Sequence, residues 1–348
     1  MTSTASYTAQ LRGNRYLWLV TGAAGFIGSH LVETLLRLEQ DVVGLDDLSR
    51  GHRSNIEQAE AAVGAQSAAR HRFVIADICD LAACRAACTD VDFVLHHAAL
   101  GSVPGSIADP VACNAANVTG FVNMLTAAKD AGVKRFIYAS SSATYGDSSK
   151  LPKTEEEIGR PLSPYAVTKY ANELYAAAFA RCYGLQCVGF RYFNVFGARQ
   201  DPDGPYAAVI PRWVRSLLNR DQVEIYGDGE TSRDFCHVQN VVQANLLAAL
   251  TERGDALNQV YNIAVGHRTT LNQLFVLLRD LLAAHDGSIR SVPATYRDYR
   301  PGDIRHSEAD IGKAKSLLGY QPTHDLAAGL AQALPWYIEQ YQPTPSGV

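Results

Sequence analysis

The sequence predicts an α/β protein, a Rossmann-like doubly wound parallel sheet with a smaller C-terminal substrate-binding α/β portion. Short apolar runs alternate with helix-like segments along the first half of the chain. These runs do not alternate between apolar and polar residues, which is typical of strands buried on both faces of a sheet. A glycine-rich turn follows the first run. With 348 residues, 47% of them hydrophobic, the chain is long enough for about two domains.

The expected strands are "YLWLVTG", "DVVGLDD", "RFVIAD", "DFVLHHAA", "KRFIYASSS" and "QCVGFRYF". Each is rich in β-branched or aromatic residues, and helix-like segments separate them. One helix is expected from about Phe26 to Leu38, and an Ala-rich helix near 57–69. Strands separated by helices favour parallel pairing through βαβ units.

From about Asn194 the sequence becomes rich in Gly, Pro and Asp, as in "GARQDPDGPYAAVIPRW". Helices are expected between these loops at Val209–Asn219, Val238–Thr251 and Leu271–Ala284. Loops that follow a regular nucleotide-binding unit are where a substrate portion is expected. Both ends, through about residue 13 and from Gln342, are interpreted as frayed tails.

Composition excludes several classes of function. The net charge is −4 and no basic block is present, so we expect no nucleic-acid partner. The chain shows no signal-peptide pattern and no run of eighteen apolar residues, so we expect a cytoplasmic protein with no membrane partner. Seven cysteines form no C-x-x-C pair, and His96-His97 lacks further ligands at metal spacing, so we expect neither disulfides nor a metal.

A dinucleotide site is predicted by "VTGAAGFIGSHL", where Gly22, Gly25 and Gly28 separate the first strand from a helix. Glycines there let the backbone approach a pyrophosphate at the helix N-terminus. The spacing departs from G-x-G-x-x-G, and a purely structural turn is the alternative. Asp46 ends the second strand at the distance expected of a ribose-binding acid, which favours NAD over NADP. Arg50, which follows closely, leaves NADP as an alternative cofactor.

A catalytic stretch is indicated by "SPYAVTK", because Tyr165 and Lys169 share one face of a helix. Hydroxyl groups at Ser141 and Ser142 end an earlier strand and can face the same cleft. Free tyrosine has a pKa near 10, so a tyrosine base needs nearby positive charge to stabilise its phenolate at neutral pH. A packed Tyr beside a solvated Lys is the structural alternative.

These motifs, with "HHAA" and "RYFNVFG", resemble the nucleotide-sugar-modifying branch of the extended short-chain dehydrogenase/reductases. More closely, the chain is similar to bacterial UDP-N-acetylglucosamine 4-epimerases of surface-polysaccharide pathways. The resemblance spans about residues 16–337. It implies a mainly NAD-binding domain over 1–193 and a mainly UDP-sugar-binding portion over 194–348, with the chain crossing back near 238–263. It also implies a homodimer.

The resemblance implies a Ser-Tyr-Lys set for catalysis, formed by Ser141 with Ser142 assisting, Tyr165 and Lys169. Tyr165 would take the proton of the sugar 4-hydroxyl while NAD+ receives the C4 hydride, and the 4-keto sugar would turn over before the hydride returns. The implied NAD-binding residues are Gly22, Gly25, Phe26, Ile27, Gly28, Asp46, Asp77, Ile78, His97, Ala98, Ala99, Asn117, Tyr165, Lys169, Tyr192 and Phe193.

For the UDP-sugar, the resemblance implies diphosphate anchors at Asn194, Arg233 and Arg300, since arginines suit phosphates by bidentate geometry. Ser307 matches a position where epimerases restricted to UDP-glucose carry a bulky tyrosine, which favours N-acetylated sugars here. The implied substrate-binding residues are Gly101, Ser102, Ser141, Ser142, Asn194, Ala208, Val209, Tyr226, Arg233, Arg300, Asp303 and Ser307.

Several alternatives stay open. A UDP-glucose/UDP-galactose or UDP-hexuronate 4-epimerase would share these motifs. Dehydratases and decarboxylases of nucleotide sugars need an acid directly after the active-site hydroxyl, where this chain has Ser142 and Ala143, and are disfavoured. A non-catalytic NAD-sensing regulator is disfavoured because Tyr165, Lys169 and both serines are all present.

Overall fold

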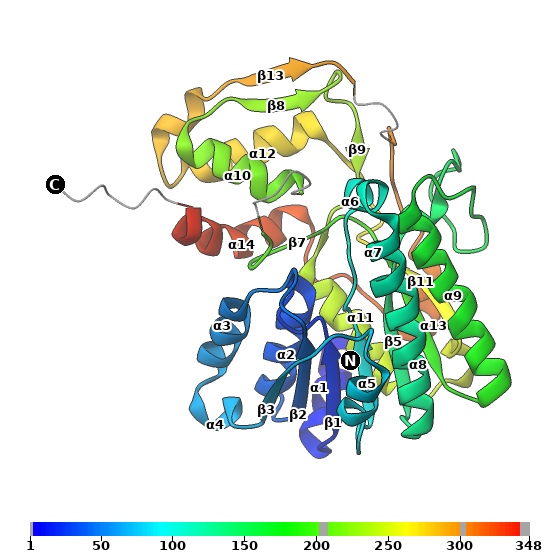
Figure 1. Cartoon of the computed structure of the whole chain (residues 1–348). Helices are drawn as coiled ribbons and strands as arrows, with labels where there is room; N and C mark the ends of the chain where they lie inside the picture. The colour runs from blue at the N-terminus through cyan, green and yellow to red at the C-terminus, as the bar shows by residue number, and fades with distance from the viewer. Residues whose placement is uncertain (1–2, 202–207, 300–303, 342–348) are drawn as a thin grey trace.

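The computed structural model describes residues 3–201, 208–299 and 304–341 (Figure 1). Its centre is a seven-stranded sheet, parallel throughout, in the order β11-β6-β5-β4-β1-β2-β3. The α/β fold and the expected strands are therefore confirmed, and β11 is added to them. The sheet strands are β1 (Leu17–Thr21), β2 (Asp41–Asp46), β3 (His71–Ile75), β4 (Phe93–His96), β5 (Arg135–Ser141), β6 (Cys187–Tyr192) and β11 (Gln259–Ile263).

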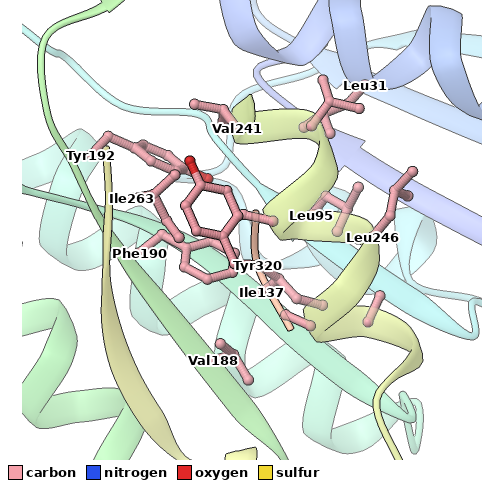
Figure 2. Packing of buried hydrophobic residues seen from close by; sticks show 14 of the residues in the cluster. Leu31, Leu95, Ile137, Val188, Phe190, Tyr192, Val241, Leu246, Ile263 and Tyr320 are labelled. Atoms are coloured by element: carbon pink, nitrogen blue, oxygen red, sulfur yellow. The ribbon is translucent and has the colours of Figure 1, made fainter. Parts of the chain in front are cut away.

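Helices cover both faces of the sheet, and its inner strands are buried on both sides, which explains why they are continuous apolar runs; the edge strand β3 is only partly buried. Helices α2 (Phe26–Arg37) and α11 (Val238–Leu250) cover one face. Figure 2 shows this layer, where Val241 and Leu246 of α11 face Ile137 and Phe190 of the sheet. The other face packs against α5 (Leu81–Ala87), α8 (Gly120–Asp130) and α9 (Pro164–Tyr183).

The N-terminal tail prediction is wrong for the described residues, because Ser3–Gly13 forms helix α1. Its Tyr7 and Leu11 are buried in the core, and the helix contacts α11. The Gln40 side-chain amide donates to the carbonyl of Leu11 at 3.0 Å and fixes the end of this helix. Residues from Gln342 onward lie outside the described part of the chain.

The expected Ala-rich helix near 57–69 is also different in the structure. It begins earlier, as α3 (Arg53–Val63), and is interrupted before the short α4 (Ala65–Ala68). Gly64 separates them with a positive φ of 80°, which a continuous α-helix cannot contain. The Ala-rich composition did not reveal this break.

The C-terminal portion packs around its own apolar core, which includes Trp213 and Phe275. Helices α10 and α12 begin where expected, and α14 follows at the end of the described chain (Figure 1). In between, α11 and β11 return to the large sheet, β11 pairing with β6. The elements of this portion are α10 (Val209–Asn219), β8 (Val223–Tyr226), β9 (Ser232–Arg233), β12 (Thr269–Thr270), α12 (Leu271–Ala283), β13 (Ala294–Arg297) and α14 (Leu326–Tyr341).

Shorter elements complete the description. In the described residues, no helix is long and apolar enough to cross a membrane. The shorter elements are α6 (Val103–Ala108), α7 (Pro110–Asn114), the π-helix η1 (Ala115–Thr119), the 3₁₀ helices η2 (Ser142–Tyr145), η3 (Gly254–Ala256) and η4 (Gly287–Ser291), strands β7 (Val195–Phe196) and β10 (Cys236–His237), and α13 (Gly312–Leu318).

Candidate active site

A cavity of about 900 Å³ lies at the carboxyl ends of the sheet strands. This is the edge at which doubly wound sheets bind their ligands. Most of the residues predicted from the sequence come together on its wall: Gly22, Gly25, Phe26, Ile27, Gly28, Asp46, Asp77, Ile78, His97, Ala98, Ala99, Gly101, Ser141, Ser142, Tyr165, Lys169, Tyr192, Asn194, Arg233 and Ser307.

The glycine loop at one end of the cavity has no room for side chains. Gly22 has φ of 68°, and a Cβ there would lie 2.7 Å from the amide nitrogen of Ala98. A Cβ on Gly28 would lie 2.0 Å from the carbonyl oxygen of Gly22. Helix α2 begins after Gly25 without a side-chain cap, so free N–H groups of its first turn remain for a ligand. The loop therefore fits the pyrophosphate of NAD.

Asp46 lies at the end of β2 with its carboxylate held by the backbone. One oxygen accepts from the N–H of Ala24 at 3.0 Å and the other from the N–H of Leu48 at 2.8 Å. Burial raises the pKa of Asp46 above its usual value, and these two hydrogen bonds oppose that rise. The fixed carboxylate can accept from ribose hydroxyl groups, in agreement with an NAD site.

Tyr165 is placed by the first turn of α9. Ser163 caps this helix by accepting from the N–H of Ala166 at 3.2 Å, and Pro164 occupies the first helical position. The N–H of Tyr165 donates to the hydroxyl of Ser106 at 3.0 Å. Burial raises the pKa of Tyr165, while a hydrogen bond with the Ser141 side chain lowers it. The protein alone therefore does not favour the phenolate, which needs further positive charge.

Lys169 lies one turn further along α9, with its ammonium 5.9 Å from the centre of the Tyr165 ring. The ammonium donates to the carbonyl oxygen of Ala139 at 2.9 Å. Burial lowers the pKa of Lys169 to about 8. The predicted Tyr-Lys pair thus shares one buried face of the helix, and the Lys169 ammonium also has donors left for a ligand.

The opposite end of the cavity is lined by hydroxyl groups and cations. Ser142, Lys153, Arg233 and Ser307 all contribute there. The acidic residues on the described wall of the cavity, Asp46, Asp47 and Asp77, belong to the cofactor end, so in the described part of the chain no carboxylate stands beside Tyr165. This end can bind a polar or anionic ligand, but its described wall offers no carboxylic acid that could act beside Tyr165.

A second cavity of about 230 Å³ adjoins the first and shares Asn194 and Arg233 with it. Three residues predicted to bind substrate, Ala208, Val209 and Tyr226, line this second cavity rather than the first. Asn194 has a positive φ of 25° and its amide donates to the carbonyl of Asp234 at 3.2 Å. Asn194 and Arg233 therefore lie where the two cavities meet.

Three predicted site residues do not line either cavity. Asn117 lies behind the wall, where its amide joins the carbonyl of Leu100 at 3.1 Å to the hydroxyl of Thr168 at 3.1 Å. Phe193 is buried in the core, and Ser102 caps α6 by accepting from the N–H of Gly105. The hydrogen bonds of Asn117 and Ser102 hold neighbouring segments together. Arg300 and Asp303 lie outside the described residues.

Some residues at the site were missed by sequence reasoning. Beneath it, the buried carboxylate of Glu173 pairs with Arg191 at 2.7 Å and accepts from the hydroxyl of Ser140 at 2.5 Å. Lys153, from a charged-looking loop, is buried in the cavity wall. For Glu173 a signal existed, since it lies four residues after Lys169 on the same helix face.

Comparisons with other proteins agree with this geometry. The chain is 38% identical to a structure described as UDP-N-acetylglucosamine 4-epimerase from Methanobrevibacter ruminantium in complex with UDP-N-acetylmuramic acid, with a TM-score of 0.85 over 94% of this chain and 99% of that one. It is 37% identical to UDP-glucose 4-epimerase from Thermotoga maritima with UDP-glucose, with a TM-score of 0.83 over 93% and 99%. A UDP-glucose 4-epimerase from Mycolicibacterium smegmatis is 36% identical over 93% of this chain and 99% of its own length.

The sequence model of one family matches residues 18–264, which include the glycine loop, Asp46, Tyr165 and Lys169. The match covers well over half of the chain and all strands of the large sheet except the first residue of β1. By this match and by the relatives above, the chain belongs to the NAD-dependent epimerase/dehydratase family.

Proposed function

We propose that this protein reversibly inverts C4 of UDP-N-acetylglucosamine and UDP-N-acetylgalactosamine, using bound NAD. The observation that carries the proposal is the arrangement along one cavity. A dinucleotide loop lies at one end, Tyr165, Lys169 and Ser141 meet beyond it, and the described wall near them offers no acid. Dehydration of a nucleotide sugar needs such an acid, whereas epimerisation does not.

In this reaction, residues of the chain would transfer the proton of the sugar 4-hydroxyl and hydrogen-bond the oxygen that becomes the carbonyl. Bound NAD supplies a reversible store for the C4 hydride. Tyr165 would take the proton of the 4-hydroxyl at its phenol oxygen and return it after the sugar has turned. Ser141, already hydrogen-bonded to Tyr165, would donate to the developing carbonyl oxygen. The Lys169 ammonium would favour the phenolate through its charge.

The nucleotide must stay bound while the sugar turns. Arg233 and Asn194 lie where the two cavities meet, which supports a role for them at the diphosphate. The smaller cavity, with Trp213 and Leu271 in its wall, has the size and apolar character for the base. We propose that this anchoring lets both faces of C4 meet the same hydride.

The preference for N-acetylated sugars rests on small residues at the sugar end. Ser307 lines the cavity, and a Cβ added to Gly101 would meet nothing within 4 Å, so there is space beside Gly101. One extra apolar contact group is worth about 1–3 kcal/mol, which corresponds to a ten- to two-hundred-fold preference. Relatives named for UDP-glucose and for UDP-N-acetylglucosamine have nearly the same identity, so the choice needs an assay.

The test is a product assay with UDP-GlcNAc, UDP-GalNAc, UDP-glucose and UDP-galactose in parallel. We expect the N-acetylated pair to be interconverted at least tenfold more efficiently. Tyr165→Phe should keep bound NAD and the fold but lower kcat by about two or more orders of magnitude. Near-parental turnover by that variant would refute the mechanism. Retention of bound NAD with no conversion of any of the four sugars would favour a non-catalytic NAD-sensing protein instead.

We also propose a homodimer formed through the outer face of α7 and α9. Val111 is 77% exposed there, and Val167, Leu174 and Tyr175 are exposed apolar residues of α9. Figure 1 shows the two helices side by side, and they contact one another. Contiguous apolar patches of this kind mark protein interfaces. Light scattering should give a particle mass twice that of one chain, and Leu174→Glu should reduce the measured mass to that of a single chain.

A further inference from the structure

Lys153 is a buried lysine in the wall of the catalytic cavity, only 5% exposed. Its backbone is fixed to the segment that carries Ser307. The N–H of Lys153 donates to the carbonyl of Glu308 at 2.8 Å, and its carbonyl accepts from the N–H of Asp310 at 2.9 Å. The Lys153 side chain therefore starts beside the residue proposed to shape the sugar end of the cavity.

Among the residues that the structure describes, the ammonium of Lys153 has no counter-charge. Its Nζ donates to the carbonyl of Ser148 and lies 6.0 Å from the centre of the Tyr145 ring, which also lines the cavity. Within the described part of the chain, no carboxylate pairs with it. Burial lowers the pKa of Lys153. Buried charges are normally paired, and an ammonium has three donors, so this group is suited to an acceptor on a ligand.

The proton transfer at C4 does not need this group, because Tyr165 and Lys169 already supply it from α9. Lys153 belongs to a different segment, the loop that pairs with residues 308–310. Hydrogen bonds from a charged donor to a carbonyl or carboxylate are among the strongest in proteins. An ammonium can therefore distinguish a sugar that carries such an oxygen from one that does not.

We propose that Lys153 is a specificity-determining residue that donates to a carbonyl or carboxylate oxygen carried by the hexose. The inference rests on the proposed function and deepens it. Two positions on the sugar can supply this chemistry: the acetamido carbonyl at C2 and a carboxylate at C6. UDP-glucose has neither, so its binding should be indifferent to the ammonium.

The experiment measures binding to NAD-loaded enzyme in a Tyr165→Phe background, so that sugars are not converted. Isothermal titration gives Kd for UDP-GlcNAc, UDP-glucuronate and UDP-glucose with Lys153 and with Lys153→Met. Methionine keeps the unbranched stem and removes the donors. We expect Kd to rise about 10- to 100-fold for the sugar whose oxygen is contacted. A rise for UDP-GlcNAc assigns the C2 substituent, and a rise for UDP-glucuronate assigns C6. Kd for UDP-glucose should change less than about threefold.

Lys150→Met is the matched control. Lys150 lies in the same loop, but its side chain is 60% exposed and pairs with Glu157 at the surface, so no Kd should change. Lys153→Gln, which keeps a neutral donor, should fall between Lys153 and Lys153→Met, and it replaces the methionine variant if that one does not fold.

Equal losses for all three sugars would overturn the proposal, because they would show that Lys153 only holds the Ser148 loop. Unchanged Kd values for all three would overturn it as well. The proposed function is judged separately, by the product assay on the parental enzyme. A parental enzyme that converts only unacetylated sugars would refute the substrate assignment, whereas the ratio of Kd values between variants judges Lys153.

Discussion

A buried ion pair beneath the site allows a quantitative prediction. Arg191 of β6 and Glu173 of α9 are only 4% and 6% exposed, and two hydrogen bonds of 2.9 and 2.7 Å join them. The hydroxyl of Ser140 donates to the same carboxylate, one residue before Ser141. The pair therefore fixes the helix that carries Tyr165 and Lys169 to the strand that ends at Ser141.

Arg191→Met leaves the Glu173 carboxylate buried, with the Ser140 hydroxyl as its remaining hydrogen-bond donor among the described residues, and removing one member of a buried pair costs about 3–5 kcal/mol. With an unfolding entropy of about 2.1 cal/mol/K per residue, the whole chain should lose about 4–7 °C in Tm. Glu173→Met likewise leaves the Arg191 guanidinium buried without its carboxylate partner. The double variant has no charge at these two positions and should recover part of the loss, which gives a large coupling energy.

The assay combines thermal unfolding with kinetics on the preferred sugar. Because Ser141 and Tyr165 are displaced while the nucleotide contacts are not, kcat should fall more than KM rises. Arg297→Met is the control, since its pair with Glu224 lies at the surface, 54% and 44% exposed, and its loss should leave Tm nearly unchanged. Single effects below about 1 kcal/mol that simply add in the double variant would refute the reasoning.

Three further outcomes are expected. Asp46→Asn should weaken NAD binding by about 1–3 kcal/mol and reduce the preference for NAD over NADP, as measured by titration with each cofactor. An unchanged preference would contradict the assignment of Asp46 to the ribose. Ser307→Tyr should abolish turnover of UDP-GlcNAc by overlap while sparing UDP-glucose, and a parental rate on UDP-GlcNAc would exclude a gate at this position. Because burial lowers the pKa of Lys169 to about 8, its ammonium is lost as pH rises through that value. The profile of kcat/KM should therefore fall above about pH 8, and Lys169→Met should lack this limb.

What the sequence predicted well depends on local pattern. The strands are apolar runs, and the glycine loop, Asp46 and the Tyr165-Lys169 spacing are set by residues close together in the chain. Helix α1 was missed because its burial depends on α11, more than two hundred residues away. Lys153 was missed for the same reason: "KLPKTEEE" has the composition of a solvated loop, and only pairing with residues 308–310 buries its backbone.

Helix α9 also shows why a polarity pattern can mislead. Its inward face carries Lys169, Asn172 and Glu173, all buried, whereas Val167 and Leu174 on its outer face are exposed. This is the reverse of an ordinary surface helix, in which the apolar stripe faces the core. Lys169 is held by the carbonyl of Ala139 and Glu173 by Arg191, whereas the buried side-chain oxygen of Asn172 has no hydrogen-bond partner among the described residues. The helix therefore gains less from apolar burial within one chain than its length would suggest, and the proposed dimer would bury its apolar face instead. The buried polar face of α9 fits the proposed role in catalysis, and its exposed apolar face fits the proposed dimer contact.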